Sequence, residues 1–301
     1  MKNIFDATVL NGLTLKNRVW RSATWEALAD DEGNLTQPLL DIYAELAAGG
    51  VGAIITGITT ISDHDALLDG IVQFHSDRFI DQHRDLTALV HEHDCKIFLQ
   101  AAIVNPRYEH VEEVPQLFVE AAIRAKAAGY DGVQLHAAHG FFLSQFIEYD
   151  RGKILGDVLD EIRAELGRDY PIIAKINGEN CLDACRVMVE HGIDAIEISG
   201  DYTSREARAH FNEGYFRHYA VGASAFDVPI ILVGGHRSIE EMNRLLITTP
   251  IEYLSMSRAL IREPSLLNRW ADGDIRPSAC VGCNACYRTP GHKCIFNLRR
   301  R

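Results

Sequence analysis

The chain has 301 residues, of which 47% are hydrophobic and 24% charged, a composition typical of a soluble globular protein. Its formal net charge of −12 argues against nucleic acid as a partner, because neutralising phosphates requires a basic face. No apolar stretch reaches membrane-spanning length, and the start of the chain lacks the apolar core of a signal peptide. We therefore expect no membrane association and a cytoplasmic location.

Strand-like and helix-like segments alternate along the sequence. Residues 8–15 (TVLNGLTL) predict a β-hairpin, since Asn-Gly favours a type I′ turn. Eight short runs rich in Ile, Val and Leu then predict strands that are buried on both faces. They span residues 18–23, 52–57, 96–101, 132–137, 171–177, 195–200, 229–235 and 253–259. Helical patterns lie between them, for example at residues 37–48, 77–93 and 114–128.

Eight successive βα units predict an α/β fold, the (β/α)₈ or TIM barrel, with the N-terminal β-hairpin as a plug at its bottom. The alternative is an open doubly wound sheet, which would normally show fewer strands and a glycine-rich first turn. No G-x-G-x-x-G occurs in this chain. We expect one barrel domain over residues 1–275, followed by a cysteine-containing extension over residues 276–301 that packs on or beside it.

The fourth predicted strand carries a distinctive pattern at its end. Residues 132–140 read GVQLHAAHG, so His136 and His139 follow a buried apolar run. In a parallel barrel, the C-terminal end of a strand is where chemistry occurs, and two imidazoles there could hold one substrate atom from two sides. The alternative is that one or both are hydrogen-bonded core histidines.

The last two predicted strands indicate a phosphate site. Gly234 and Gly235 end the seventh strand, and Ser257 and Arg258 end the eighth. The loops after these strands commonly bind phosphate in barrels, where glycine lets backbone N–H groups approach and arginine adds a bidentate charge. Glycine is also required by any tight turn, so the coincidence with Ser257 and Arg258 carries this prediction.

The chain has seven cysteines, and four of them cluster near its end. Cys280, Cys283, Cys286 and Cys294 have the close spacing of metal ligands. Four thiolates suit a [4Fe–4S] cluster or zinc, and free thiols are the third possibility.

In this order and spacing, the motifs resemble those of the Old Yellow Enzyme family of FMN-dependent oxidoreductases, and the likeness covers nearly the whole chain. The matching segments are LKNRV at 15–19, SATW at 22–25, IITG at 54–57, LQ at 99–100, HAAHG at 136–140, KIN at 175–177, GG at 234–235, SR at 257–258 and REP at 262–264. In the larger members of the family, a four-cysteine [4Fe–4S] site lies where this chain has its cluster, with three residues between the second and third cysteines instead of two.

The resemblance implies FMN as cofactor and NAD(P)H as reductant. The implied FMN contacts are Ala23, Thr24, Gly57, Gln100, Lys175, Gly234, Gly235, Ser257 and Arg258. Gln100 would bond the flavin ring and Lys175 would face flavin N1, where a cation stabilises the negative charge of the reduced state. The alternatives are a salt bridge for Lys175 and a core amide for Gln100. His136 and His139 would be the catalytic pair that anchors the acceptor, beside Trp25 and Phe141.

The sequence departs from the family's pattern at several places, and these departures limit how much of the family's function can be inferred for this chain. The family has HAAHGY, and its tyrosine donates a proton to substrate carbon; here Phe141 takes that place and cannot donate. The loops after Gln100 and after the fourth strand are shortened, which predicts an open flavin face or a partner that covers it. Trp25 replaces a smaller residue, and it would either pack or stack over the substrate.

These features together predict an FMN-dependent oxidoreductase that takes hydride from NAD(P)H and reduces an electron-poor small molecule, such as an enone, quinone or nitro compound. One alternative is an electron-transfer or non-catalytic flavoprotein subunit. Another is a barrel that binds a different phosphorylated ligand, which Gln100 and Lys175 argue against. We also expect a homo-oligomer and, if the cysteines hold a cluster, an external electron-transfer partner.

Overall fold

A computed structural model describes residues 1–65, 68–179, 181–200 and 213–298 of the chain. Eight parallel strands form a closed barrel, because each pairs with the next and the last, β12, pairs with the first, β3. The strands are β3 (Val19–Arg21), β4 (Ala53–Ile55), β7 (Lys96–Ala102), β8 (Gly132–Ala137), β9 (Ile172–Asn177), β10 (Ala195–Ser199), β11 (Ile230–Val233) and β12 (Tyr253–Met256). All eight predicted strands and the (β/α)₈ fold are confirmed.

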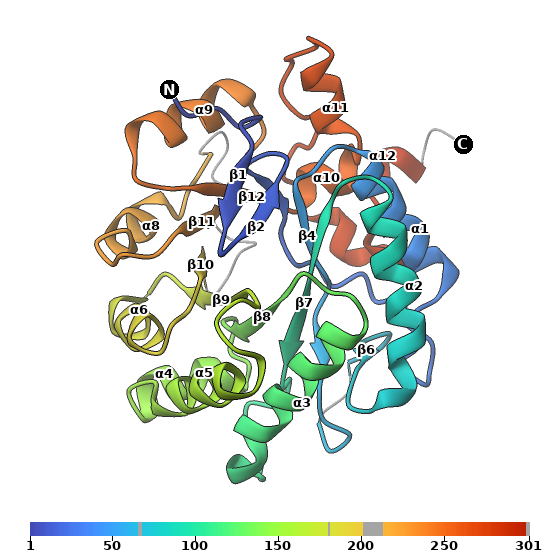
Figure 1. Ribbon diagram of the computed structural model, residues 1–301. Coiled ribbons are helices and arrows are strands. Elements are labelled where there is room, and N and C mark those ends of the chain that lie inside the picture. The colour runs from blue at the N-terminus through green and yellow to red at the C-terminus, as the bar shows by residue number, and fades with distance from the viewer. Residues whose placement is uncertain (66–67, 180, 201–212, 299–301) are drawn as a thin grey trace.

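Helices surround the barrel, as Figure 1 shows. They are α1 (Gln37–Ala48), α2 (Ile80–His91), α3 (Val114–Ala127), α4 (Phe142–Tyr149), α5 (Lys153–Leu166), α6 (Cys181–Glu190), α8 (Arg217–Ala223), α9 (Ile239–Thr248), α10 (Arg258–Arg262), α11 (Leu266–Ala271) and α12 (Ile295–Leu298). Short 3₁₀ turns are η1 (Asp77–Phe79), η2 (Val111–Glu113), η3 (Ala285–Arg288) and η4 (Pro290–His292). The apolar faces of the α-helices pack on the outward-facing Ile, Val and Leu side chains of the strands.

The predicted hairpin is present as β1 (Thr8–Leu10) and β2 (Leu13–Leu15), which pair antiparallel. Asn11 and Gly12 at its turn have positive φ angles of 43° and 77°, as a type I′ turn requires. Leu10 and Leu15 pack against the inward-facing side chains of the strands in one buried apolar cluster. In Figure 1 the dark-blue hairpin crosses the centre of the ring of strands. It closes the N-terminal end of the barrel.

Two features of the fold were not predicted from the sequence. The connection after β4 forms two short strands, β5 (Thr59–Thr60) and β6 (Val72–Gln73), of which β5 pairs with β7. The predicted eighth strand extended to residue 259, whereas β12 ends at Met256 and Arg258 begins α10. The two-residue strands β5 and β6 lie below the length at which alternation of polar and apolar residues is informative.

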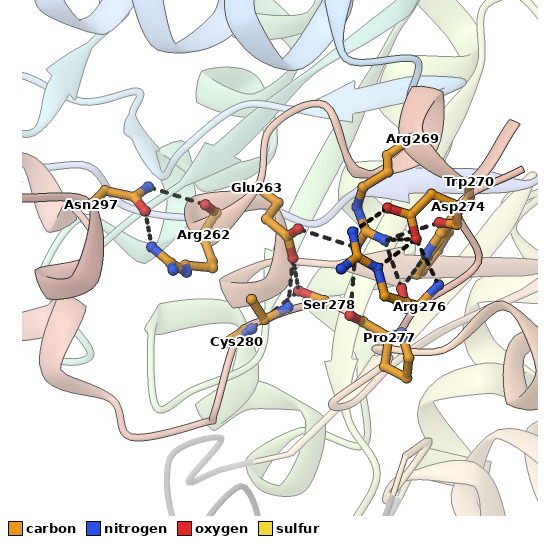
Figure 2. Close-up of polar contacts among 11 residues, drawn as sticks. Arg262, Glu263, Arg269, Trp270, Asp274, Arg276, Pro277, Ser278, Cys280 and Asn297 are labelled. Carbon is orange, nitrogen blue, oxygen red and sulfur yellow. Dashed lines mark hydrogen bonds and ion pairs between the residues drawn. The ribbon is translucent and has the colours of Figure 1, made fainter. Parts of the chain in front are cut away.

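The C-terminal segment is fastened to the barrel's last helices by polar contacts (Figure 2). The Glu263 carboxylate accepts hydrogen bonds from Ser278 Oγ at 2.9 Å and from the Ala279 backbone N–H at 2.6 Å. The Trp270 indole N–H donates to the Arg276 carbonyl at 3.0 Å. Further along, the Asn297 amide donates to the Arg262 carbonyl at 3.1 Å. The extension is therefore held in a defined position over α10 and α11.

Candidate active site

A cavity of about 250 Å³ opens at the C-terminal ends of the barrel strands. Most of the residues predicted for the site line it together: Ala23, Thr24, Trp25, Gln100, His136, His139, Phe141, Lys175, Gly235, Ser257 and Arg258. Cys280 lines it as well. Gly57 and Gly234 are not among the lining residues. Gly57 supports the first loop instead, since a Cβ there would lie 2.6 Å from the Thr24 carbonyl oxygen.

The floor of this cavity belongs to a layer of buried polar side chains on the barrel interior, of which Ser22, Gln100, Lys175 and Ser255 line the cavity directly. Ser22, Gln100, Gln134, Lys175, Glu197 and Ser255 are each at most 3% exposed. They come from β7, β8, β9, β10 and β12 and from the residue that follows β3. Because side chains alternate along a strand, residues two positions earlier face the same interior, and there the side chains are apolar. These residues include Trp20, Phe98, Ile173, Ala195 and Tyr253.

Hydrogen bonds connect this polar layer into one network. The Gln100 amide N–H donates to Gln134 Oε1 at 2.8 Å, and the Gln134 amide N–H donates to Glu197 Oε2 at 2.8 Å. Ser22 and Ser255 donate their hydroxyls to Glu197 Oε1 at 2.7 and 2.6 Å. The Lys175 ammonium lies 2.9 Å from Ser22 Oγ and 3.3 Å from Glu197 Oε2. Every member therefore has partners, as buried polar groups require.

Both alternatives considered for Lys175 and Gln100 describe part of what the structure shows. Lys175 does form a buried salt bridge, and Gln100 does bond another amide. Both side chains nevertheless line the cavity. Their roles toward a cofactor remain predictions.

The two histidines lie side by side, with ring centroids 5.1 Å apart and planes almost perpendicular. The Ala138 backbone N–H donates to His136 Nδ1 at 3.3 Å, which places the ring proton on Nε2 as a donor. His139 has a left-handed backbone, φ 61°, and its N–H donates to Asn177 Oδ1 at 3.0 Å. His139 Nε2 lies 3.0 Å from Ser199 Oγ. A rare backbone conformation is thus fixed by a contact from the next strand.

Both imidazoles are neutral at physiological pH. Burial, with the neighbouring His139 and Lys175, lowers the pKa of His136 well below its usual value. Burial and the Lys175 charge lower the pKa of His139 to about 3. The pair therefore offers neutral hydrogen-bonding groups, which suit a carbonyl, phenolate or nitro oxygen.

The side of the cavity next to the histidines is apolar. Trp25, Leu68 and Phe141 pack on a small buried cluster that includes Ile58. The Phe141 ring stands edge-on to His136 at 4.8 Å. Trp25 is braced from the extension, because His292 donates from Nδ1 to its carbonyl oxygen and stacks edge-on at 5.5 Å. Trp25 thus packs and also faces the cavity.

The opposite side of the cavity has the features of a phosphate site. Gly234 has φ 144°, and a Cβ there would lie 3.2 Å from the Tyr215 backbone nitrogen, so a side chain would press on the turn. Ser257 Oγ lies 2.8 Å from Thr24 Oγ1. Arg258 donates to the Asn284 amide oxygen and, at 3.2 Å, to the Tyr215 hydroxyl. Gly235, Arg237 and Arg258 all line this side.

The cavity fits FMN in the chemistry of its lining. One side carries arginines and glycine backbone for a phosphate, the floor carries amide, ammonium and hydroxyl groups for a polar ring edge, and the remaining wall is apolar. Two lining residues also carry buried ring nitrogens that have no hydrogen-bond partner, Nε1 of Trp25 and Nδ1 of His236. A polar ligand in the cavity could satisfy such groups.

The four cysteines of the extension surround a second, small cavity beside the first, with mostly apolar side chains between them. Arg258, Cys280 and Val281 line both cavities. Across the part of the chain that the structure describes, no three His, Cys, Asp or Glu side chains converge to hold a metal ion.

Sequence reasoning missed several residues of the site. Glu197 and Gln134 each interrupt an apolar strand with a polar residue, which was the available signal. No sequence pattern identifies Tyr215 and Arg237 as residues of the site. Val281, Gly282 and Tyr287 of the extension also line the main cavity, whereas the extension was expected to pack on or beside the barrel with no stated part in the cavity.

The fold and cavity define a (β/α)₈ barrel with a nucleotide-type cofactor site at its C-terminal end. The chain belongs to the NADH:flavin oxidoreductase / NADH oxidase family, whose sequence model matches residues 3–109 and 105–275. This membership confirms the resemblance and makes FMN the cofactor of the site. No helix among the described residues is long and apolar enough to cross a membrane.

Similar curated proteins include the NADH oxidase of Thermoanaerobacter brockii, 25% identical over 99% of this chain and 55% of that protein. The NADPH dehydrogenase of Clostridium acetobutylicum is 24% identical over 87% of this chain and 92% of that protein. The chain thus spans about half the length of some curated relatives it matches. A solved 2-naphthoyl-CoA reductase superposes with a TM-score of 0.85 at 18% identity, over 94% of this chain and 54% of that one. The Old Yellow Enzyme homologue of Zymomonas mobilis gives 0.74 at 19% identity, over 93% and 96%.

Proposed function

We propose that this protein is an FMN-dependent oxidoreductase that takes hydride from NAD(P)H and reduces an electron-poor small molecule with an oxygen acceptor group. The observation that carries this proposal is one cavity with three chemistries: the neutral His136 and His139 pair, the Lys175 and Gln100 floor, and the Arg258 phosphate side. FMN supplies the hydride transfer when bound. The family membership and relatives named NADH oxidase and NADPH dehydrogenase support the reaction class.

The protein's own groups have distinct tasks in this proposal. Arg258, Ser257 and the Gly235 backbone hold the phosphate. Gln100 and Lys175 orient the polar edge of the flavin. His136 donates from Nε2 to the acceptor oxygen, and His139 helps to hold it. Trp25, Ile58 and Phe141 exclude water and favour a flat, apolar acceptor such as an enone, quinone or nitroarene.

Anaerobic spectroscopy of the purified protein tests the proposal. We expect bound flavin, bleaching of its absorbance by NADH or NADPH, and recovery on addition of a quinone or cyclohexenone. The control is the double variant His136→Ala/His139→Ala, which should keep FMN and lose the long-wavelength absorbance that a phenol induces in the wild type. A wild-type protein that neither contains nor binds flavin would overturn the proposal.

A second candidate is an electron-transfer flavoprotein subunit. Phe141 favours it, because a phenyl ring cannot protonate an alkene. The four-cysteine cavity favours it as well, and we propose that this cavity holds a [4Fe–4S] cluster that passes electrons to an external partner. Iron and acid-labile sulfide analysis of anaerobically purified protein distinguishes a cluster from zinc or free thiols.

We also propose the remaining features of the organisation. Residues 1–275 would form the barrel domain and residues 276–301 its extension. Leu182 and Val221, on the neighbouring helices α6 and α8, are 49% and 42% exposed, which supports a homo-oligomer that covers them. All seven cysteines lack disulfide bonds, which supports a cytoplasmic location. Sedimentation velocity measures the oligomeric state.

A further inference from the structure

Glu197 is a charged residue in an unusual position. It lies in the middle of β10, is 0% exposed, and has no solvent to stabilise its charge. Hydroxyls, an amide and an ammonium all point at its two carboxylate oxygens, at distances from 2.6 to 3.3 Å. An ionised carboxylate only accepts hydrogen bonds, whereas a protonated carboxyl must also donate one. Surroundings that consist of donors therefore suit the carboxylate ion.

The balance of forces on this group favours the charged form. Burial alone would raise the pKa of Glu197, but Lys175, Ser255, Ser22 and Gln134 outweigh it and hold the pKa below the usual value. Glu197 is therefore an anion 3.3 Å from the only lysine that lines the cavity among the described residues. At that distance, the electrostatic effects of the two opposite charges largely cancel at the position of a ligand bound above them.

We propose that Glu197 is a positioning residue that lowers the electron affinity of the bound flavin, by offsetting the charge of Lys175 beneath it. This inference rests on the proposed function, because it requires flavin in the cavity. A reduced flavin, or one that has added a nucleophile, carries negative charge on its polar ring edge. Lys175 stabilises that charge and Glu197 opposes it, so the floor acts as a neutral pair.

Glu197 also fixes which way the floor's amides point. The carboxylate can only accept, so Gln134 must direct its N–H toward it and its oxygen toward Gln100. Gln100 then directs its N–H toward Gln134, and its amide oxygen is left for the ligand. One buried carboxylate thus sets both the charge and the donor pattern of the floor.

Sulfite binding measures this effect without turnover. Sulfite adds to oxidised flavin and leaves a negative charge on the ring edge, so its dissociation constant reports stabilisation of that charge. Glu197→Gln removes the carboxylate's charge and keeps its shape. We expect it to bind sulfite about tenfold more tightly and to raise the flavin's two-electron potential correspondingly, about 30 mV for each factor of ten.

A charge cycle separates this effect from structural damage. Lys175→Gln should weaken sulfite binding, and Lys175→Gln/Glu197→Gln should return it toward the wild-type value. If Glu197→Gln does not fold, Ser255→Ala serves as the second variant. It removes one hydroxyl from the carboxylate, leaves its charge less compensated, and should weaken sulfite binding several-fold.

The outcomes are distinct. Flavin content is measured first on each protein by release and absorbance. A wild type without flavin overturns the proposed function and this inference together. A flavin-containing Glu197→Gln variant whose sulfite affinity and potential equal those of the wild type overturns this inference alone. The same holds for a Ser255→Ala variant with unchanged or tighter sulfite binding.

Discussion

The interior of the barrel has two layers built on the same strands, and they differ completely in chemistry. The layer next to the hairpin contains Trp20, Phe98, Ile173, Ala195 and Tyr253, whose rings and branched chains pack without solvent. Two residues further along the same strands, the layer next to the cavity contains Ser22, Gln100, Lys175, Glu197 and Ser255. A step of two residues along each strand therefore separates an apolar core from a polar floor.

The comparison shows how the barrel separates stability from chemistry. The lower layer gains its free energy from burying large rings, with Trp20 only 5.1 Å from Phe98 and 5.3 Å from Tyr253 between ring centroids. The upper layer gains little from burial, and its groups are satisfied only by one another. We therefore expect changes in the lower layer to reduce folding stability, and changes above it to alter ligand binding.

The largest expected effect tests the lower layer. Trp20→Ala removes a fully buried ring whose indole N–H has no partner to lose. We expect the free energy of unfolding to fall by about 3–5 kcal/mol, measured by equilibrium denaturation in urea. The matched upper-layer variant Ser255→Ala removes one hydrogen bond to a carboxylate and should lose less, about 1.5–3 kcal/mol. Equal losses at both positions would contradict the division into two layers.

The next prediction concerns the rim above the upper layer. Phe141→Tyr places a hydroxyl beside His136, where it can protonate an alkene. General acid catalysis is typically worth 10²–10⁴ in rate, so enone reduction should rise by about 10² or more, while quinone reduction changes little. Stopped-flow oxidation of the reduced protein by cyclohexenone measures this. A wild type already as fast as the variant would mean that another group supplies the proton.

A smaller effect is expected at the phosphate side of the upper end. Arg258→Ala removes a charge-assisted contact to the phosphate, which should weaken FMN binding by about 1.5–3 kcal/mol. Flavin fluorescence titration of the apoprotein measures the dissociation constant. Riboflavin, which lacks the phosphate, is the matched control ligand, and its affinity should be the same in wild type and variant.

The smallest expected effect is a pH dependence of folding stability, which arises from His139 at the cavity end of the barrel. The pKa of His139 is about 3 in the folded protein and about 6.5 when the chain is unfolded, so the unfolded chain binds an extra proton between these values. Stability should therefore fall as the pH drops below 6.5, by up to about 1.4 kcal/mol per pH unit for this residue. Denaturation at pH 7, 6 and 5 should show a shallower slope for His139→Gln than for the wild type.

The sequence predicted the strands and the hairpin plug better than it predicted the polar floor. Alternating βα patterns located all eight strands, because strands buried on both faces produce continuous apolar runs. His136, His139, Gln100 and Lys175 were placed at strand ends and do line one cavity. Glu197 was missed because its role depends on partners from three other strands and from the residue after β3, none of which is near it in sequence.

The extension was predicted as a cysteine-containing segment on or beside the barrel, without a part in the cavity. Its contribution to the cavity depends on how Glu263 and Trp270 hold residues 276–279, and no local pattern encodes that contact. The short strands β5 and β6 were missed for a related reason, since β5 is defined by its pairing with β7. Long-range pairing decides both features.

The brace between His292 and Trp25 has a consequence for how relatives of this protein could diverge. The family's sequence match ends at residue 275, yet Trp25 is held from residue 292 and Tyr287 also lines the cavity. Residues beyond the family match therefore help to shape the cavity beside Trp25 and also, through the contact of Asn284 with Arg258, on its phosphate side. Exchanging this tail between homologous barrels would alter both of these sides while leaving the strands and the floor untouched.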